Sequence, residues 1–230
     1  MMTIAADVDE AVRGIPSGST VLVSGFGKTG QPLDLLAALL RTDATDLTVF
    51  SNNAGNGDEG LAILIKEGRV RRIVCSFPRQ SDSWHFEKEF AAGRIELELV
   101  PQGTLAERIR AGGAGIAGFF TATAYGTPLA EGKETRIIDG RGYVLEEPIR
   151  GDFSLIKAHT ADRLGNLTFR KTARNFGPIM ASAATTTIVQ VTSIVPAGQM
   201  DPDHVVSPGI FTDVVVATPA VACDREGGVR

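Results

Sequence analysis

The sequence predicts an α/β fold with a mostly parallel sheet flanked by helices and a β-rich C-terminal lobe. Short apolar, β-branched runs alternate with helix-patterned segments through the first half of the chain. Several of these runs lead into glycine, asparagine or serine, which is typical of the turn between a strand and the next helix. Beyond residue 112 the pattern is more irregular and richer in strands. The 230 residues suit a single domain over 1–219, and we expect 220–230 to form a disordered tail.

Four strand–helix units are expected before the pattern changes. A short helix at 7–14 precedes them, and Pro16 and Gly18 turn the chain into the first strand. Units of this spacing are joined by right-handed crossovers, so their strands should be parallel. In the third of the following helices we expect Trp84, Phe86 and Phe90 to be buried anchors. The expected strands span 20–24, 47–50, 70–75 and 95–100, and the helices after them span 32–40, 59–66, 81–92 and a segment opening after Pro101.

The second half carries the features of the β-rich lobe. Residues 112–118 are nearly all glycine, alanine and isoleucine, which suits close approach of the backbone to a partner or a ligand. Residues 135–147 predict a β-hairpin that turns at Asp139 and Gly140. Further strands are expected at 153–158, 186–194 and 211–217, with a short helix at 175–184.

Composition excludes several classes of function. The formal net charge of −4 argues against nucleic acid as the main partner. Two cysteines cannot build a disulfide framework, so a reducing compartment is expected. No apolar run reaches the roughly 18 residues of a membrane span, and the first residues are acidic where a secretion signal is basic. We therefore expect a cytoplasmic enzyme component with no membrane partner.

The turn after the first strand contains the glycine pattern Gly25-x-Gly27-x-x-Gly30. It matches the dinucleotide fingerprint literally, but that fingerprint also needs an acidic residue at the end of the second strand. Here the second strand ends in Ser51, Asn52 and Asn53. A nicotinamide or flavin site is therefore disfavoured. A plain glycine-lined turn and a turn shaped to admit a phosphate or pantetheine arm both remain open.

Amide side chains follow two of the predicted strands. Asn52 and Asn53 stand at the end of the second strand, and Gln102 follows the fourth. The Gln102 carboxamide, beside the backbone N–H groups of a helix that starts at Gly103, forms a plausible oxyanion hole for a thioester carbonyl. The alternatives are structural: asparagine is common in turns, and Thr104 and Glu107 fit a helix-capping pattern.

Groups for other chemistry are scarce. His85, His159 and His204 lie far apart in the sequence, and no metal-ligand spacing is present, so no metal is expected. Cys75 falls inside an apolar strand and is expected to be an inert core thiol. Glu107, Arg108 and Arg110 are interpreted as a charged helix face. These residues therefore do not supply the catalytic groups expected of a hydrolase or a redox enzyme.

Several long motifs follow one another along the chain: residues 51–55, 101–108, 109–115, 143–146, 150–153, 162–166 and 174–176. In this order they resemble the A subunit of the two-subunit 3-oxoacid coenzyme A transferases. The resemblance runs from about Thr20 to Val216, nearly the whole chain. It implies an α/β fold with a mostly parallel sheet. It also implies an obligate partner, a homologous B subunit, in an A2B2 assembly.

The resemblance also implies a mechanism. A glutamate of the B subunit carries out the attack on the donor acyl-CoA, and the resulting glutamyl-CoA thioester then passes CoA to an acceptor carboxylate. No permanently bound cofactor is implied, since CoA and succinyl-CoA are substrates. Gln102 corresponds to the family's oxyanion donor, with Gly103 beside it, and Gly25, Phe26 and Gly27 correspond to its glycine-rich turn. Many members have Leu-Cys-Gly after that turn, whereas this chain has Lys28-Thr29-Gly30.

The stretch 75–83 looks like the 3-oxoadipate branch of the family, although an acetoacetate-specific subunit remains the alternative. 3-Oxoadipate has a second carboxylate, which a guanidinium would bind well. Arg79 is the candidate for that carboxylate, and a loop-bracing role is equally open. Lys28 is a second candidate, for the same carboxylate or for a CoA phosphate. A non-catalytic module that binds an acyl-CoA is the competing class of function.

Overall fold

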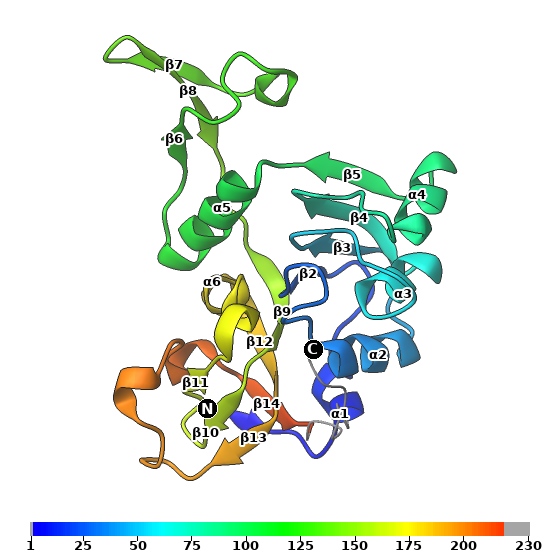
Figure 1. Cartoon of the computed structure of the whole chain (residues 1–230), viewed down its shortest axis with the longest axis vertical. Helices are drawn as coiled ribbons and strands as arrows, with labels where there is room; N and C mark the ends of the chain where they lie inside the picture. The colour runs from blue at the N-terminus through cyan, green and yellow to red at the C-terminus, as the bar shows by residue number, and fades with distance from the viewer. Residues whose placement is uncertain (1, 219–230) are drawn as a thin grey trace, which may run out of the picture.

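The computed structural model describes residues 2–218 and is built around one eight-stranded sheet (Figure 1). The order across the sheet is β1-β14-β12-β9-β2-β3-β4-β5, and every neighbouring pair is parallel. The predicted parallel sheet is therefore confirmed. Its strands are β1 (Thr3–Ile4), β2 (Thr20–Val23), β3 (Leu47–Phe50), β4 (Val70–Cys75), β5 (Glu96–Leu99), β9 (Gly151–Lys157), β12 (Ala184–Val191) and β14 (Val214–Ala217).

The sheet is extended on both sides of β2 as the chain proceeds. Strands β2 to β5 follow one another outward, and β9, β12 and β14 then extend the sheet on the other side of β2. The carboxyl ends of β2 and β9 thus form a topological switch point, the place where open α/β sheets bind ligands. The predicted lobe is consequently part of the main sheet. The third of its strands begins at 214, because Gly209–Phe211 form a 3-10 turn.

Helices cover both faces of the sheet, and a separate apolar core lies between the sheet and the helices on each face. In Figure 1 the first four helices lie on one side and α5 and α6 on the other. Each expected helix is present, with shorter bounds at most ends. The helices are α1 (Val8–Val12), α2 (Leu33–Arg41), α3 (Leu61–Lys66), α4 (Trp84–Ala91), α5 (Gln102–Ala114) and α6 (Gly177–Ser182).

Only one of the three expected anchors of α4 is buried. Phe86 is 1% exposed, whereas Trp84 and Phe90 are 47% and 37% exposed. The prediction was wrong for Trp84 because it is the first residue of α4. It was wrong for Phe90 because that ring stacks on the outer side of the buried Phe86 ring, at a centroid distance of 5.5 Å.

The glycine-rich run packs closely against other parts of this chain at its first two positions. Gly112 and Gly113 lie inside α5, which packs against α6. A Cβ atom on Gly112 would stand 1.9 Å from the carbonyl oxygen of Ile149, and one on Gly113 would stand 2.2 Å from Ser182 Oγ. Glycine is therefore required at 112 by the close passage of the segment that leads into β9, and at 113 by the close approach of the end of α6.

Two small sheets extend from the main body. The predicted hairpin is confirmed as β7 (Thr135–Ile138) and β8 (Arg141–Glu146), with positive φ at Asp139 and Gly140. Together with β6 (Phe119–Thr121) it forms an arm that projects from the body in Figure 1. The second small sheet, β10 (Thr160–Asp162), β11 (Leu167–Thr168) and β13 (Ser193–Val195), was not predicted.

The predicted disordered tail lies outside the described residues. None of the helices within residues 2–218 is both long and apolar enough to cross a membrane.

Candidate active site

The loops at the carboxyl ends of four neighbouring strands enclose one cavity. Its volume is about 420 Å³, and each of β2, β3, β4 and β5 is followed by at least one lining residue. Four residues predicted from the sequence meet there, although they are far apart in the chain. The lining consists of Phe26, Gly27, Asn52, Ser76, Phe77, Gln80 and Gln102.

Gln102 is the first residue of α5 and is exposed at this cavity. The first α-helical hydrogen bond joins Leu105 N–H to the carbonyl of Pro101, so the N–H groups before Leu105 have no partner within the helix. The thirteen-residue helix directs its positive dipole end at the same place. Within residues 2–218 the Gln102 carboxamide makes no hydrogen bond of its own. These donors together can stabilise an oxyanion.

Asn52 offers a second amide to the cavity from the end of β3. The residue is 2% exposed, and its Oδ1 accepts a hydrogen bond from Ser76 Oγ at 2.9 Å. Ser76 Oγ also lies 3.1 Å from the Asn52 carbonyl. Because Oδ1 is occupied, Nδ2 is the atom left to bind a ligand, and it makes no hydrogen bond to the described part of the chain.

Asn53, although predicted as a contact, lies behind the cavity and braces its wall. It is 1% exposed, and its Nδ2 donates to Asn56 Oδ1 at 2.8 Å. Asn56 Nδ2 in turn donates to Gln80 Oε1 at 2.6 Å and to Asp82 Oδ1 at 2.7 Å. This relay joins the loop after β3 to the loop before α4 and sets the position of Gln80.

The glycine turn after β2 forms the opposite wall. Gly25, Gly27 and Gly30 have φ values of 136°, 60° and 79°, in the region that side chains other than glycine rarely adopt. Phe26 and Thr29 close the turn with two backbone hydrogen bonds of 2.9 and 3.2 Å. The turn holds Phe26 at the cavity, where it is 50% exposed, and Phe77, which also lines the cavity, is 56% exposed.

The other predicted contacts lie outside this lining. The Lys28 ammonium pairs with Glu59 Oε1 at 2.7 Å, and the hydrogen bond and charge of Glu59 raise the pKa of Lys28 above its usual value. The Arg79 guanidinium lies over the ring of Phe90, 5.9 Å from its centroid. Gly25 and Gly103 flank lining residues without lining the cavity themselves.

Sequence reasoning missed Ser76, Phe77 and Gln80. Ser76 and Phe77 directly follow β4, so they share the sheet edge with Asn52 and Gln102. The rule that ligands meet the carboxyl ends of parallel strands would have identified both.

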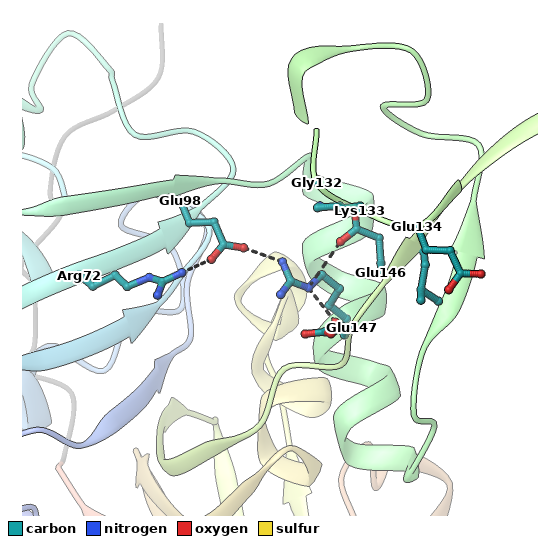
Figure 2. Close-up of a pocket in the computed structure, with 9 residues that line it drawn as sticks. Arg72, Glu98, Gly132, Lys133, Glu134, Glu146 and Glu147 are labelled. Atoms are coloured by element: carbon teal, nitrogen blue, oxygen red, sulfur yellow. Dashed lines mark hydrogen bonds and ion pairs between the residues drawn. The ribbon is translucent and has the colours of Figure 1, made fainter. Parts of the chain in front are cut away.

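The larger cavity, of about 530 Å³, lies on the side of the arm and has a different character (Figure 2). Arg72 pairs with Glu98, Glu98 with Arg108 at 2.8 Å, and Lys133 with Glu146 at 2.7 Å. Arg108 and Glu146 are 3.8 Å apart, which joins the pairs into one chain of alternating charges. This network holds the arm against β5 and α5, and its charges are already neutralised, so we interpret it as structural.

Arg108 corrects the expectation of an exposed charged helix face. Its side chain is only 12% exposed, whereas Glu107 and Arg110 form a half-exposed pair at 2.9 Å as expected. Burial acts to raise the pKa of Glu98, but the hydrogen bonds and charges of Arg108 and Arg72 outweigh it, so the pKa lies below its usual value. A carboxyl with a lowered pKa stabilises the fold above its unfolded pKa, and this stabilisation is lost as the pH falls through the folded value.

We therefore predict that Arg108→Gln lowers the unfolding free energy at pH 7 by about 3 kcal/mol, because it leaves Glu98 and the buried Glu146 short of a partner. The deficit should shrink as the pH falls through the pKa of Glu98, because a protonated Glu98 no longer needs the arginine as a partner. Urea unfolding of the purified chain at several pH values measures this. Arg110→Gln, on the same helix, should cost less than about 1 kcal/mol. Equal losses in the two variants would contradict the structural role of the network.

Comparison with known proteins decides the family. The model of the coenzyme A transferase family matches residues 5–218. The chain belongs to the coenzyme A transferase family. It is 60% identical to the A subunit of 3-oxoadipate CoA-transferase from Pseudomonas putida, over 94% of this chain and 93% of that one. It is 48% identical to a probable A subunit of succinyl-CoA:3-ketoacid coenzyme A transferase from Bacillus subtilis, over 94% of this chain and 90% of that one.

The fold agrees with that assignment. The solved glutaconate coenzyme A-transferase from Acidaminococcus fermentans matches with a TM-score of 0.83 at 22% identity, over 94% of this chain and 75% of that chain. The resemblance inferred from the motifs is thus confirmed for the family, and the CoA-transferase family fold is confirmed for the sheet and its helices.

Proposed function

We propose that this CoA-transferase chain is the A subunit of a succinyl-CoA:3-oxoadipate CoA-transferase. The observation that carries the proposal is the similarity to the A subunit of 3-oxoadipate CoA-transferase over nearly the whole length of both chains. CoA then moves from succinyl-CoA to 3-oxoadipate by a ping-pong mechanism. The enzyme works in the cytoplasm and needs no permanently bound cofactor.

The cavity is equipped to polarise a thioester and lacks a group to attack it. Its polar side chains are three carboxamides and one hydroxyl, and the hydroxyl of Ser76 is engaged with Asn52. Cys75 is fully buried, and burial raises the pKa of its thiol to about 12, so it is neutral at physiological pH. The family resemblance implies that the nucleophile is a glutamate of the partner, the B subunit, and the lack of an attacking group in this lining supports that assignment.

The reaction then divides between two polypeptides. The partner's carboxylate adds to the thioester carbonyl, and Gln102 and the first N–H groups of α5 stabilise the negative oxygen that forms. CoA thiolate leaves, and it returns to the glutamyl carbonyl as the acyl group departs as succinate. The acceptor carboxylate repeats these steps in reverse. The exposed Phe26 and Phe77 are proposed to be covered by substrate and partner in an A2B2 assembly.

Recognition of the second carboxylate of 3-oxoadipate is assigned to Arg79, with Lys28 as the alternative. Arg79 is exposed, and its loop also carries Gln80, which lines the cavity. Its contact with Phe90 lies at the long end of the cation–π range, which leaves the guanidinium free to reorient. Lys28 would first have to give up Glu59. Arg79 is therefore the better candidate.

Reconstitution tests the proposed function. The purified chain alone should transfer no CoA, and addition of the B subunit should restore transfer from succinyl-CoA. The complex should use 3-oxoadipate about tenfold or more better than acetoacetate in kcat/KM, as one additional charge-assisted contact predicts. Preference for acetoacetate would instead support the 3-ketoacid enzyme. CoA thioester binding with no transfer by the complex would support a non-catalytic module.

The Arg79→Gln variant of the same complex separates the two candidate cations. Its preference for 3-oxoadipate over acetoacetate should disappear, with acetoacetate use unchanged. Lys28→Gln is the matched variant, and a loss of preference there alone would transfer the assignment to Lys28.

A further inference from the structure

A second cavity opens on the same edge of the sheet, at the topological switch point. Its volume is about 440 Å³. Lys157 and His159 stand at the end of β9, Thr192 follows β12, and Arg170 and Lys171 come from the segment before α6. Open α/β sheets bind ligands in this position, and no residue that lines the cavity at Gln102 comes from β9.

The lining of this cavity is basic without a counter-charge. Lysine, arginine and histidine contribute four of its nine residues, and none of the nine is acidic. Within residues 2–218, Lys157, Arg170 and Lys171 form no ion pair, although most of the other cavity-lining cations of this chain do. Three threonines add hydroxyl groups to the same wall. Cations gathered around one space without a partner repel one another, and an anion placed among them relieves that repulsion.

The two cavities share a wall. Phe26 and Gly27 line the cavity of Gln102, and Thr29, from the same turn, lines the basic one. The glycine turn is held against the segment before α6 that lines the basic cavity, because Asn175 Nδ2 donates to the Thr29 carbonyl at 3.0 Å. A Cβ atom on Gly30 would stand 2.5 Å from the Ala173 carbonyl, so the two segments touch closely. A ligand that crosses this turn could occupy both cavities at once.

We propose that the basic pocket, formed around Lys157, His159, Arg170 and Lys171, binds phosphate groups. The difference between the two cavities supports this proposal. The cavity at Gln102 offers neutral amides suited to a thioester, and the basic pocket offers cations suited to phosphate. The phosphates come either from the nucleotide end of CoA, which rests on the proposed function, or from a separate phosphorylated small molecule. Their shared chemistry is a phosphate ester or diphosphate.

Direct binding tests the site without reference to catalysis. Pyrophosphate is titrated into the full-length chain, alone and in complex with its partner, and the heat of binding is measured. Arg170→Gln/Lys171→Gln should weaken binding about tenfold or more, since each lost charge-assisted hydrogen bond accounts for such a factor. Glutamine removes the charge but keeps a polar, unbranched side chain, and it imposes no new strain at Lys171, where φ is already 50°. Lys157→Gln gives an independent second variant.

Lys88→Gln serves as the matched control, because it removes an exposed lysine of α4 that makes no ion pair with the described residues. Its pyrophosphate affinity should equal that of the unsubstituted chain. No pyrophosphate binding by the unsubstituted chain, or equal binding by all variants, would overturn the proposal even if the complex transfers CoA normally.

The KM values of the reconstituted complex distinguish the two sources of phosphate, CoA and a separate phosphorylated molecule. If CoA supplies it, the double variant should raise KM for succinyl-CoA about tenfold or more and leave KM for succinyl-pantetheine, which has no nucleotide, unchanged. If a separate molecule supplies it, both KM values stay unchanged while pyrophosphate binding is still lost. A complex without any transferase activity would remove the proposed function and leave the binding result standing.

Discussion

Gln102→Ala should lower the turnover of the reconstituted enzyme on the order of 10²- to 10³-fold, with KM for succinyl-CoA little changed. Gln102 borders the cavity with a carboxamide that is not engaged elsewhere in residues 2–218, beside the N–H groups that open α5. Its hydrogen bond gains strength as the carbonyl oxygen becomes negative. The loss therefore falls on the transition state rather than on the bound substrate.

Steady-state kinetics with succinyl-CoA and 3-oxoadipate measure this effect. Glu107→Ala is the matched control, because Glu107 lies on the same helix and, among residues 2–218, pairs only with the exposed Arg110. It should retain normal turnover. A near-normal rate for Gln102→Ala, or a loss confined to KM, would remove Gln102 from the chemical step.

Gly112→Ala should destabilise the chain by roughly 3 kcal/mol, although alanine ordinarily favours a helix over glycine. The added Cβ atom would stand 1.9 Å from the Ile149 carbonyl oxygen. The backbone there cannot withdraw freely, because Ile149 N–H donates to the Arg108 carbonyl at 2.8 Å. Either α5 or the segment entering β9 must shift, and both position the active-site edge of the sheet.

Gly103→Ala provides the comparison within one helix. A Cβ atom at Gly103 would meet nothing within 4 Å, so the ordinary helix preference should apply and stability should not fall. Urea unfolding of both variants and of the unsubstituted chain gives the two free energies. A loss at Gly103 as large as at Gly112 would contradict the claim that close packing at Gly112 sets the requirement for glycine.

The strands of the first half could be predicted because each is a short run rich in apolar and β-branched residues that ends at turn-forming residues. Residues 47–50 and 70–75 are examples in which expected and observed bounds coincide. The short strands β10, β11 and β13 give no such signal, since two or three residues are too few for a period. Their pairing depends on how β9 and β12 are placed in the tertiary structure, which no local sequence pattern specifies.

The site was predictable to the extent that it depends on strand ends. Asn52 and Gln102 meet because parallel strands bring their carboxyl ends together, and order along the chain is enough to infer that. The neighbours of Lys28 and Asn53 are set by how loops pack. No local pattern encodes those contacts, and the same is true of Arg108, whose helical spacing suggested an exposed face.

The central claim is that the attacking carboxylate belongs to the partner polypeptide. Intact-mass measurement of both chains of the complex, after incubation with succinyl-CoA and no acceptor, tests this directly. We predict that the B subunit gains the mass of a covalently attached CoA and that this chain keeps its unmodified mass. A CoA adduct on any residue of this chain would contradict that assignment.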